Sequence, residues 1–284
     1  MFFKYTSRFL AFVAIAVGAG FCTFAIMMAL AQAETLGTLS GPVERTESVL
    51  KAPDDADPWL GGDFQLGVVG GVATNIYRDD DGTDGFVLPY IAYDAARLHI
   101  GLDELRVTAW ENDRFSVSAI GSVRFKPFDA DDGPYLAGMK DRDTAFEAGL
   151  ALAAQVGPGE IQLSSLFDVS GVHHGQQVDV SYHQTSAIRS VNLEWGGGVT
   201  WQSRDLADYM VGVRRNEVRA NRAFYEPDDA FIPYLDLVAS YPLSESVTLL
   251  GQTGVQYLPD AYTDSPIVDK DYVFSLGVGM IYAF

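Results

Sequence analysis

The sequence predicts an all-β protein, a transmembrane antiparallel up-and-down β-barrel of about twelve strands. Three observations predict it. Apolar and small residues alternate at the carboxyl end, the amino end resembles a secretory signal peptide, and most of the remaining chain consists of alternating blocks separated by turns. The localisation that follows is the outer membrane of a Gram-negative bacterium.

The carboxyl-terminal segment, residues 272–284, alternates at every position. One face carries only apolar or aromatic side chains, Tyr272, Phe274, Leu276, Val278, Met280, Tyr282 and Phe284. Successive side chains of a strand point to opposite faces, so this face would contact lipid, and the mostly small side chains between would face the lumen. We expect the barrel-assembly machinery to recognise this strand. The alternative is an amphipathic edge strand of a soluble sandwich.

The amino-terminal segment has the features of a signal peptide. Lys4 and Arg8 precede an almost wholly apolar run over 9–30, and the triplet 31–33 fits an A-x-A cleavage site between Ala33 and Glu34. An uncleaved membrane anchor is the alternative. Domain boundaries follow: 1–33 as signal peptide, 34–61 as a flexible periplasmic tail, and 62–284 as the barrel.

The composition excludes one class of partner. The predicted signal peptide carries two of the 19 basic and none of the 38 acidic residues, so the mature chain has 17 minus 38, a formal charge of −21. Such a surface repels nucleic acid, and we expect no nucleic-acid role. The outer-membrane lipid and lipopolysaccharide are the partners that a barrel would meet.

Alternating blocks follow one another along the chain. They lie at 64–68, 86–93, 98–110, 115–125, 146–156, 161–169, 178–182, 191–201, 235–241, 247–257 and 272–284. Bacterial single-chain barrels have an even number of strands, so we take a twelfth strand from residues 205–213. Ten strands would result if the region between Arg97 and Trp110 were irregular.

Charged residues interrupt the apolar blocks on the face expected to line the lumen. The acidic members are Glu147, Asp168, Glu194 and Asp236, and the basic members are Arg97, Arg114 and Arg124. In a barrel of this size, charges of both signs can pair across the lumen. The structural interpretation is a salt-bridged, largely filled interior, and the functional alternative is a narrow selective pore.

The sequence contains no catalytic or cofactor signature. The acidic run 79–84 fails the EF-hand pattern because Asp84 stands where glycine is needed, so we expect a solvated loop. His173 and His174 are adjacent and would point in opposite directions on a strand, which disfavours a shared metal. We therefore expect no enzyme, no metal site and no cofactor.

Dispersed segments resemble the MipA/OmpV family of outer-membrane proteins. They are Val87-Leu88-Pro89-Tyr90 before Tyr93-Asp94, the turn 171–175, Asp208-Tyr209-Met210 before 211–213, Ala239-Ser240-Tyr241 and Asp264-Ser265-Pro266-Ile267-Val268. The resemblance implies a scaffold in the cell envelope, linking a murein hydrolase and a synthase; a small-solute channel and a surface adhesin or receptor are the alternatives. The chain departs from the family at Val211, where Phe is usual, and in the arginine-rich stretch 214–222.

Overall fold

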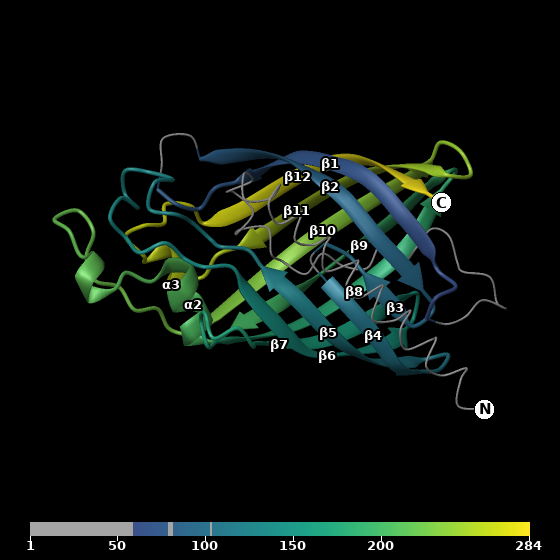
Figure 1. The fold of residues 1–284 in the computed structure, drawn as a ribbon, viewed down its shortest axis with the longest axis horizontal. Coiled ribbons are helices and arrows are strands. Elements are labelled where there is room, and N and C mark those ends of the chain that lie inside the picture. The colour runs from purple at the N-terminus through teal and green to yellow at the C-terminus, as the bar shows by residue number, and fades with distance from the viewer. Residues whose placement is uncertain (1–58, 79–81, 103) are drawn as a thin grey trace, which may run out of the picture. The chain divides into compact units, whose positions relative to one another are not determined.

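The computed structural model describes residues 59–78, 82–102 and 104–284. Within them, twelve antiparallel strands close into a barrel, and β1 pairs with β12 (Figure 1). The strands are β1 (Asp63–Thr74), β2 (Thr83–Ala95), β3 (Leu98–Ile100), β4 (Glu104–Glu111), β5 (Phe115–Arg124), β6 (Ala145–Val156), β7 (Gly159–Asp168), β8 (Gln176–Ile188), β9 (Val191–Gln202), β10 (Ala230–Pro242), β11 (Val247–Tyr257) and β12 (Tyr272–Ala283). The predicted fold is confirmed. The predicted signal peptide, most of the predicted tail and part of the acidic run 79–84 lie outside the described residues.

The number of strands is twelve, as predicted, but one of the twelve lies in a different part of the chain from the one predicted. The block 98–110 supplies two strands, β3 and β4, and the expected strand at 205–213 is wrong. Residues Arg204–Val211 form helix α2 instead, with Leu206, Ala207, Met210 and Val211 buried. Those positions recur with the helical period, so one side of α2 is apolar and packs inward.

The side chains of β12 alternate between exposed and buried, as its sequence predicts. Every residue from Tyr272 to Tyr282 in steps of two is exposed, as is Phe284, whereas Val273, Gly277, Ile281 and Ala283 between them are buried. β12 joins the two ends of the sheet, with Met280 opposite Val68 of β1 and Leu249 of β11. The outer surface of this seam is therefore a continuous apolar band.

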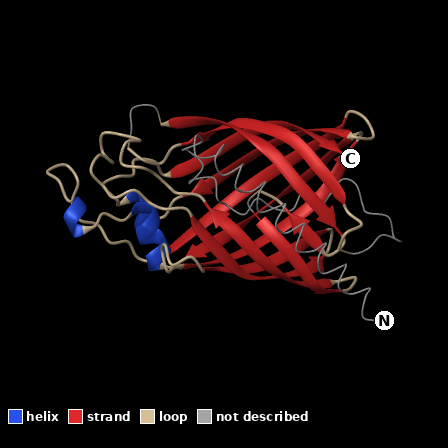
Figure 2. Ribbon diagram, viewed as in Figure 1, coloured by secondary structure: helices blue, strands red, loops and turns tan. Residues whose placement is uncertain are grey.

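The two ends of the barrel differ in their connections. One end carries the short turns 96–97, 112–114, 157–158, 189–190 and 243–246, and the other carries the longer connections 75–82, 125–144, 169–175, 203–229 and 258–271. The helices α2, η2 (Arg215–Glu217) and α3 (Asp260–Thr263) all belong to the long-loop end (Figure 2). No helix in the described ranges has the length and apolar character needed to cross a bilayer.

The wall is uneven at the β3–β4 hairpin. β2 pairs with β1 from Thr83 to Asp94, but its other edge meets β3 only at residues 93–95. Over residues 83–92, that edge has no strand partner among the described residues. Pro89 lies in this stretch, and proline, which cannot donate a ladder hydrogen bond, is tolerated on such an edge.

Candidate functional site

The long-loop end of the barrel is covered by a packed lid. The connections β1–β2, β5–β6, β9–β10 and β11–β12 converge there on one hydrophobic core, together with inward-facing residues at the ends of the strands. Its members are Ile76, Tyr77, Phe128, Leu136, Met139, Leu206, Ala207, Tyr209, Met210, Val211, Val213, Ala230, Ile232, Leu258, Tyr262, Ile267, Val268 and Val273. Loops rarely bury this much apolar surface, so the lid is a packed structure and not a set of separate solvated loops.

A buried ion pair joins two of the lid loops. Arg142 of the β5–β6 connection lies 3.1 Å from the carboxylate of Glu217 in η2, and both side chains are almost wholly buried. The same guanidinium donates to the backbone oxygens of Tyr209, Lys140 and Gly212 at 3.0–3.2 Å. Burial alone would raise the pKa of Glu217, but hydrogen bonds from Arg142 and from two backbone N–H groups outweigh it and lower that pKa.

Tyrosine hydroxyls fasten the lid further. Tyr77 donates to the carbonyl of Met210 at 2.9 Å, and Tyr262 donates to Oε1 of Gln202, on the barrel wall, at 2.5 Å. Burial raises the pKa of both tyrosines above the ordinary value, so both stay neutral donors at physiological pH. These contacts link the loop core both to itself and to β9.

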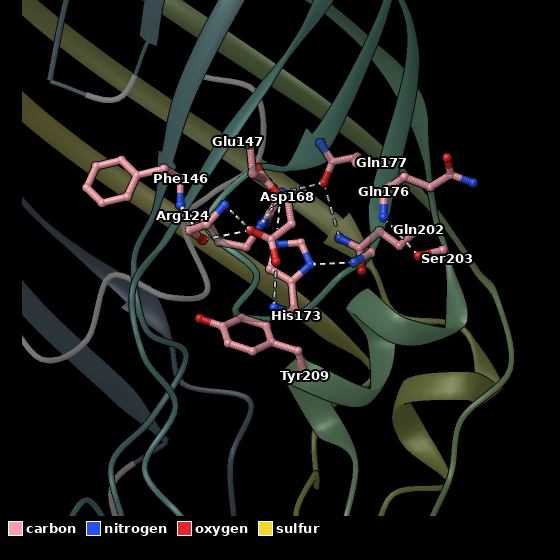
Figure 3. A network of polar contacts seen from close by, with 12 residues as sticks. Arg124, Phe146, Glu147, Asp168, His173, Gln176, Gln177, Gln202, Ser203 and Tyr209 are labelled. Atoms are coloured by element: carbon pink, nitrogen blue, oxygen red, sulfur yellow. Dashed lines mark hydrogen bonds and ion pairs between the residues drawn. The ribbon is translucent and has the colours of Figure 1, made fainter.

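Beneath the lid lies a buried polar network, shown in Figure 3. Arg124 of β5 forms a two-pronged pair with Glu147 of β6 at 2.9 and 3.0 Å, and it also donates to Gln177 of β8 at 2.9 Å. The Arg124 and Glu147 side chains are 3% and 1% exposed. Two-pronged arginine–carboxylate pairs combine strength with fixed geometry, so this pair locks β5 and β6 at the mouth.

His173 connects that network to the lid. Its Nδ1 accepts from the N–H of Gly175 at 3.0 Å, so in the neutral ring the proton is on Nε2. Nε2 lies 3.1 Å from Glu147, in poor geometry for a hydrogen bond, and the ring lies 5.2 Å from that of Tyr209 in α2. The ring therefore bridges the wall and the helix.

Asp168 organises the loop that carries His173. Its carboxylate accepts from the backbone N–H groups of residues 170, 171, 173 and 174 and from the Ser170 hydroxyl, all at 2.7–3.0 Å. One carboxylate thus accepts hydrogen bonds from most of the backbone N–H groups of the turn. Within this turn His174 has a left-handed backbone conformation, with φ at 57°. The role of Asp168 is to shape the loop.

A second polar cluster lies lower on the wall, where β9 carries glycines on its inward face. His183 of β8 and Asp236 of β10 both lie opposite Gly196, and their side chains meet at 2.9 Å. A Cβ at Gly196 would lie 2.6 Å from the His183 ring. The missing side chain therefore lets residues from strands two apart pair over the strand between them.

The structure separates the predicted lumen charges into two groups. Arg124, Glu147, Asp168, Glu194 and Asp236 lie on inward strand positions, and the pairs that form join neighbouring or next-neighbouring strands instead of spanning the lumen. Arg97 and Arg114 differ from the prediction because they lie in the short turns 96–97 and 112–114, with Arg114 exposed. Apolar alternation locates a strand well but not the residue at which it ends.

Several site residues were missed. These are Arg142, Glu217 and Tyr262 of the lid and Gln177 and Gln202 of the network. The first three lie in long connections outside the alternating blocks, and the two glutamines lie one residue beyond the predicted blocks 178–182 and 191–201. The apolar content of the long loops is the sequence signal for the lid, because a solvated loop would not carry large apolar side chains such as Leu136, Met139 and Ile267. Within the described residues, no cluster of three or more metal-ligating side chains occurs.

Fold and site together define the class of protein. A closed antiparallel barrel with an apolar outer band, polar lumen wall, short turns at one end and long loops at the other is an outer-membrane β-barrel. The comparisons agree. The family described as "MltA-interacting protein MipA" matches residues 66–284, and the chain belongs to that family.

The relatives that the chain resembles include a protein named as a putative outer-membrane protein. The chain is 30% identical over 227 residues to the MltA-interacting protein of Escherichia coli K12, covering 78% of this chain and 91% of that one. It is 27% identical over 201 residues to the putative outer membrane protein YiaT of the same organism, covering 69% and 81%. Among solved structures, it resembles the NanC porin at 11% identity and a TM-score of 0.39, covering 76% of this chain and 98% of that one.

Proposed function

We propose that this barrel is an interaction scaffold of the cell envelope, whose short-turn rim binds a periplasmic murein hydrolase or synthase. The observation that carries the proposal is the lid. An apolar core, a buried ion pair and buried tyrosines cover the mouth of the barrel. This favours a function in which the rims bind other proteins over one in which solutes pass through the lumen. The name of the Escherichia coli relative supports the choice of partner class.

The charges of the lumen wall fit this proposal. One common way to make a pore selective is a ring of charges of one sign along its path. Here Arg124 is neutralised by Glu147, and His183 is paired with Asp236. The Arg124–Glu147 pair stiffens the wall and adds no net charge to it.

The short-turn rim is the surface offered to a periplasmic partner. Bacterial barrels place short turns in the periplasm, so residues 157–158 and 243–246 would face the murein layer. Gly157, Pro158, Leu243 and Ser244 are all exposed. The predicted tail precedes β1, which also begins at this end.

Site-specific crosslinking tests the proposal. Photo-crosslinkers at Pro158 and Ser244 should capture a protein that mass spectrometry identifies as a murein hydrolase or synthase. Matched crosslinkers at Pro134 and Asn221, both exposed in the long loops, should not. The purified barrel should also show little conductance in planar bilayers. Porin-like ohmic conductance with no murein enzyme captured at the short-turn rim would favour the channel alternative instead.

A further inference from the structure

A hairpin extends from the lid at the long-loop end, and its arginines have no role in the function proposed above. It runs from Val213 to Tyr225, which pair with each other at its base, while Arg219 and Arg222 pair near its tip. The short helix η2 lies on this hairpin and is the outermost helical coil at the long-loop end in Figure 1. We call residues 213–225 the arginine hairpin.

Buried contacts hold the arginine hairpin in place. The Arg222 guanidinium is almost fully buried and donates to the backbone oxygen of Glu217 at 2.7 and 3.0 Å, and also to those of Tyr135 and Ala137. Glu217 is itself held by Arg142 of the lid. The tip is therefore presented in a fixed conformation by the lid core, and it is not a loose loop.

The exposed side chains of the arginine hairpin, from its base to its tip, are basic and partly apolar. Arg215 and Arg219 are exposed, and neither forms an ion pair with any carboxylate in the described part of the chain. The Arg215 guanidinium lies 4.6 Å above the ring of Phe224, and Phe224 and Val218 are 41% and 45% exposed. By contrast Arg204, at the base of the same connection, pairs with Asp228.

Two exposed arginines without a carboxylate partner make this hairpin locally basic, on a chain whose net charge is −19. Elsewhere on the same loop the surface is acidic, with Glu226, Asp228 and Asp229 exposed near the base. An anion approaching the loop is thus repelled by residues 226–229 and attracted by the arginines of the hairpin. Guanidinium groups bind phosphate oxygens through two parallel hydrogen bonds, which gives specificity for phosphate over a diffuse anion.

We propose that the arginine hairpin binds the phosphorylated sugars of lipopolysaccharide in the surrounding outer leaflet. The long-loop end of an outer-membrane barrel faces outward, so these phosphates are the anions nearest to the tip. Arg215 and Arg219 supply the bonds to phosphate, and Phe224 and Val218 supply an apolar contact for the sugar faces. The contact fixes the lid against the membrane surface.

Binding of purified lipopolysaccharide to the full-length mature barrel in detergent tests this inference. R215Q/R219Q should bind about twenty-five-fold more weakly, since each basic residue near an anionic surface contributes roughly a five-fold factor. R114Q/R189Q removes the same charge from exposed positions in the short turns and should bind within about two-fold of the native chain. R215K/R219K keeps the charge but not the two-pronged geometry and should fall in between.

Enzymatically dephosphorylated lipopolysaccharide should lose affinity for the native chain, and inorganic phosphate at millimolar concentration should displace intact lipopolysaccharide only partly. Equal binding of the dephosphorylated form, or equal losses in the two glutamine variants, would overturn the inference. Complete displacement by inorganic phosphate would assign the tip to free phosphate instead. Self-association that disappears in R215Q/R219Q, with lipopolysaccharide binding unchanged, would assign the tip to a second copy of the chain.

Discussion

Removal of the Arg142 side chain should release the lid. In Arg142→Ala the carboxylate of Glu217 stays buried without its partner, and three backbone carbonyls lose a donor. Breaking a buried pair from one side typically costs about 3–5 kcal/mol. Since about 1.4 kcal/mol is a factor of ten, the open population of the lid should rise on the order of 10²- to 10³-fold.

Hydrogen exchange is the assay that reports such local opening. In the native chain, the amides of α2 should exchange slowly because Leu206, Met210 and Val211 are buried. In Arg142→Ala they should exchange much faster, while the amides of β6 and β12 should be unchanged. The open lid should also increase conductance in planar bilayers.

Arg204→Ala is the matched control. Arg204 pairs with Asp228 at 2.8 Å in the same long connection, but its side chain is 57% exposed. An exposed pair contributes at most about 1 kcal/mol, so exchange in α2 should change little. If Arg142→Ala and Arg204→Ala behaved alike, the buried pair would not be what closes the lid.

Three further predictions follow from other parts of the barrel. Met280→Arg on the outer face of β12 should cost about 2–4 kcal/mol of barrel stability if Met280 lies near the bilayer midplane. Gly279→Arg, on the inner face, should instead act by crowding Val69. Equal stability of the two variants in refolding titrations would contradict the assignment of Met280 to the lipid face and Gly279 to the lumen face. Because the pKa of Glu217 is lowered in the folded lid, its stabilising contribution is present at neutral pH and is lost as the pH falls below about 4. The protection of the lid amides, measured relative to their intrinsic exchange rate at each pH, should therefore fall only in acid. Gly196→Val should separate His183 from Asp236, visible as loss of their 2.9 Å contact in a structure of the variant, and an intact contact would contradict the role given to the glycine.

Strand periodicity explains why the barrel was predictable and the lid was not. The alternation of residues 272–284 is a local property of the chain, and it determines which face meets lipid wherever the strand lies. The strand predicted at 205–213 rests only on the even strand number of bacterial barrels, whereas its apolar positions 206, 207, 210 and 211 recur with the helical period. The helical form of α2 depends on packing against the other loops.

The polar site was only partly predictable for a related reason. Arg124, Glu147 and Asp236 stand out as charges within apolar strands, so their inward position could be inferred from alternation alone. The pairing of Arg142 with Glu217 joins loops 75 residues apart, and no periodicity encodes it. Likewise, the meeting of His183 and Asp236 depends on a glycine in the strand between them, which has meaning only once the register is known.

The lid core joins parts of the chain that are far apart in sequence, and this determines when it can form during folding. Tyr77 follows the first strand and Val268 precedes the last, yet the two form a β-bridge, and Arg78 donates from its backbone to Ile267 at 2.8 Å. Contacts between such distant parts of a chain form late, because the entropy of closing the intervening loop must be overcome first. The lid core can be completed only when β12 has reached β1, so protection of the lid from protease marks the moment at which the barrel has closed.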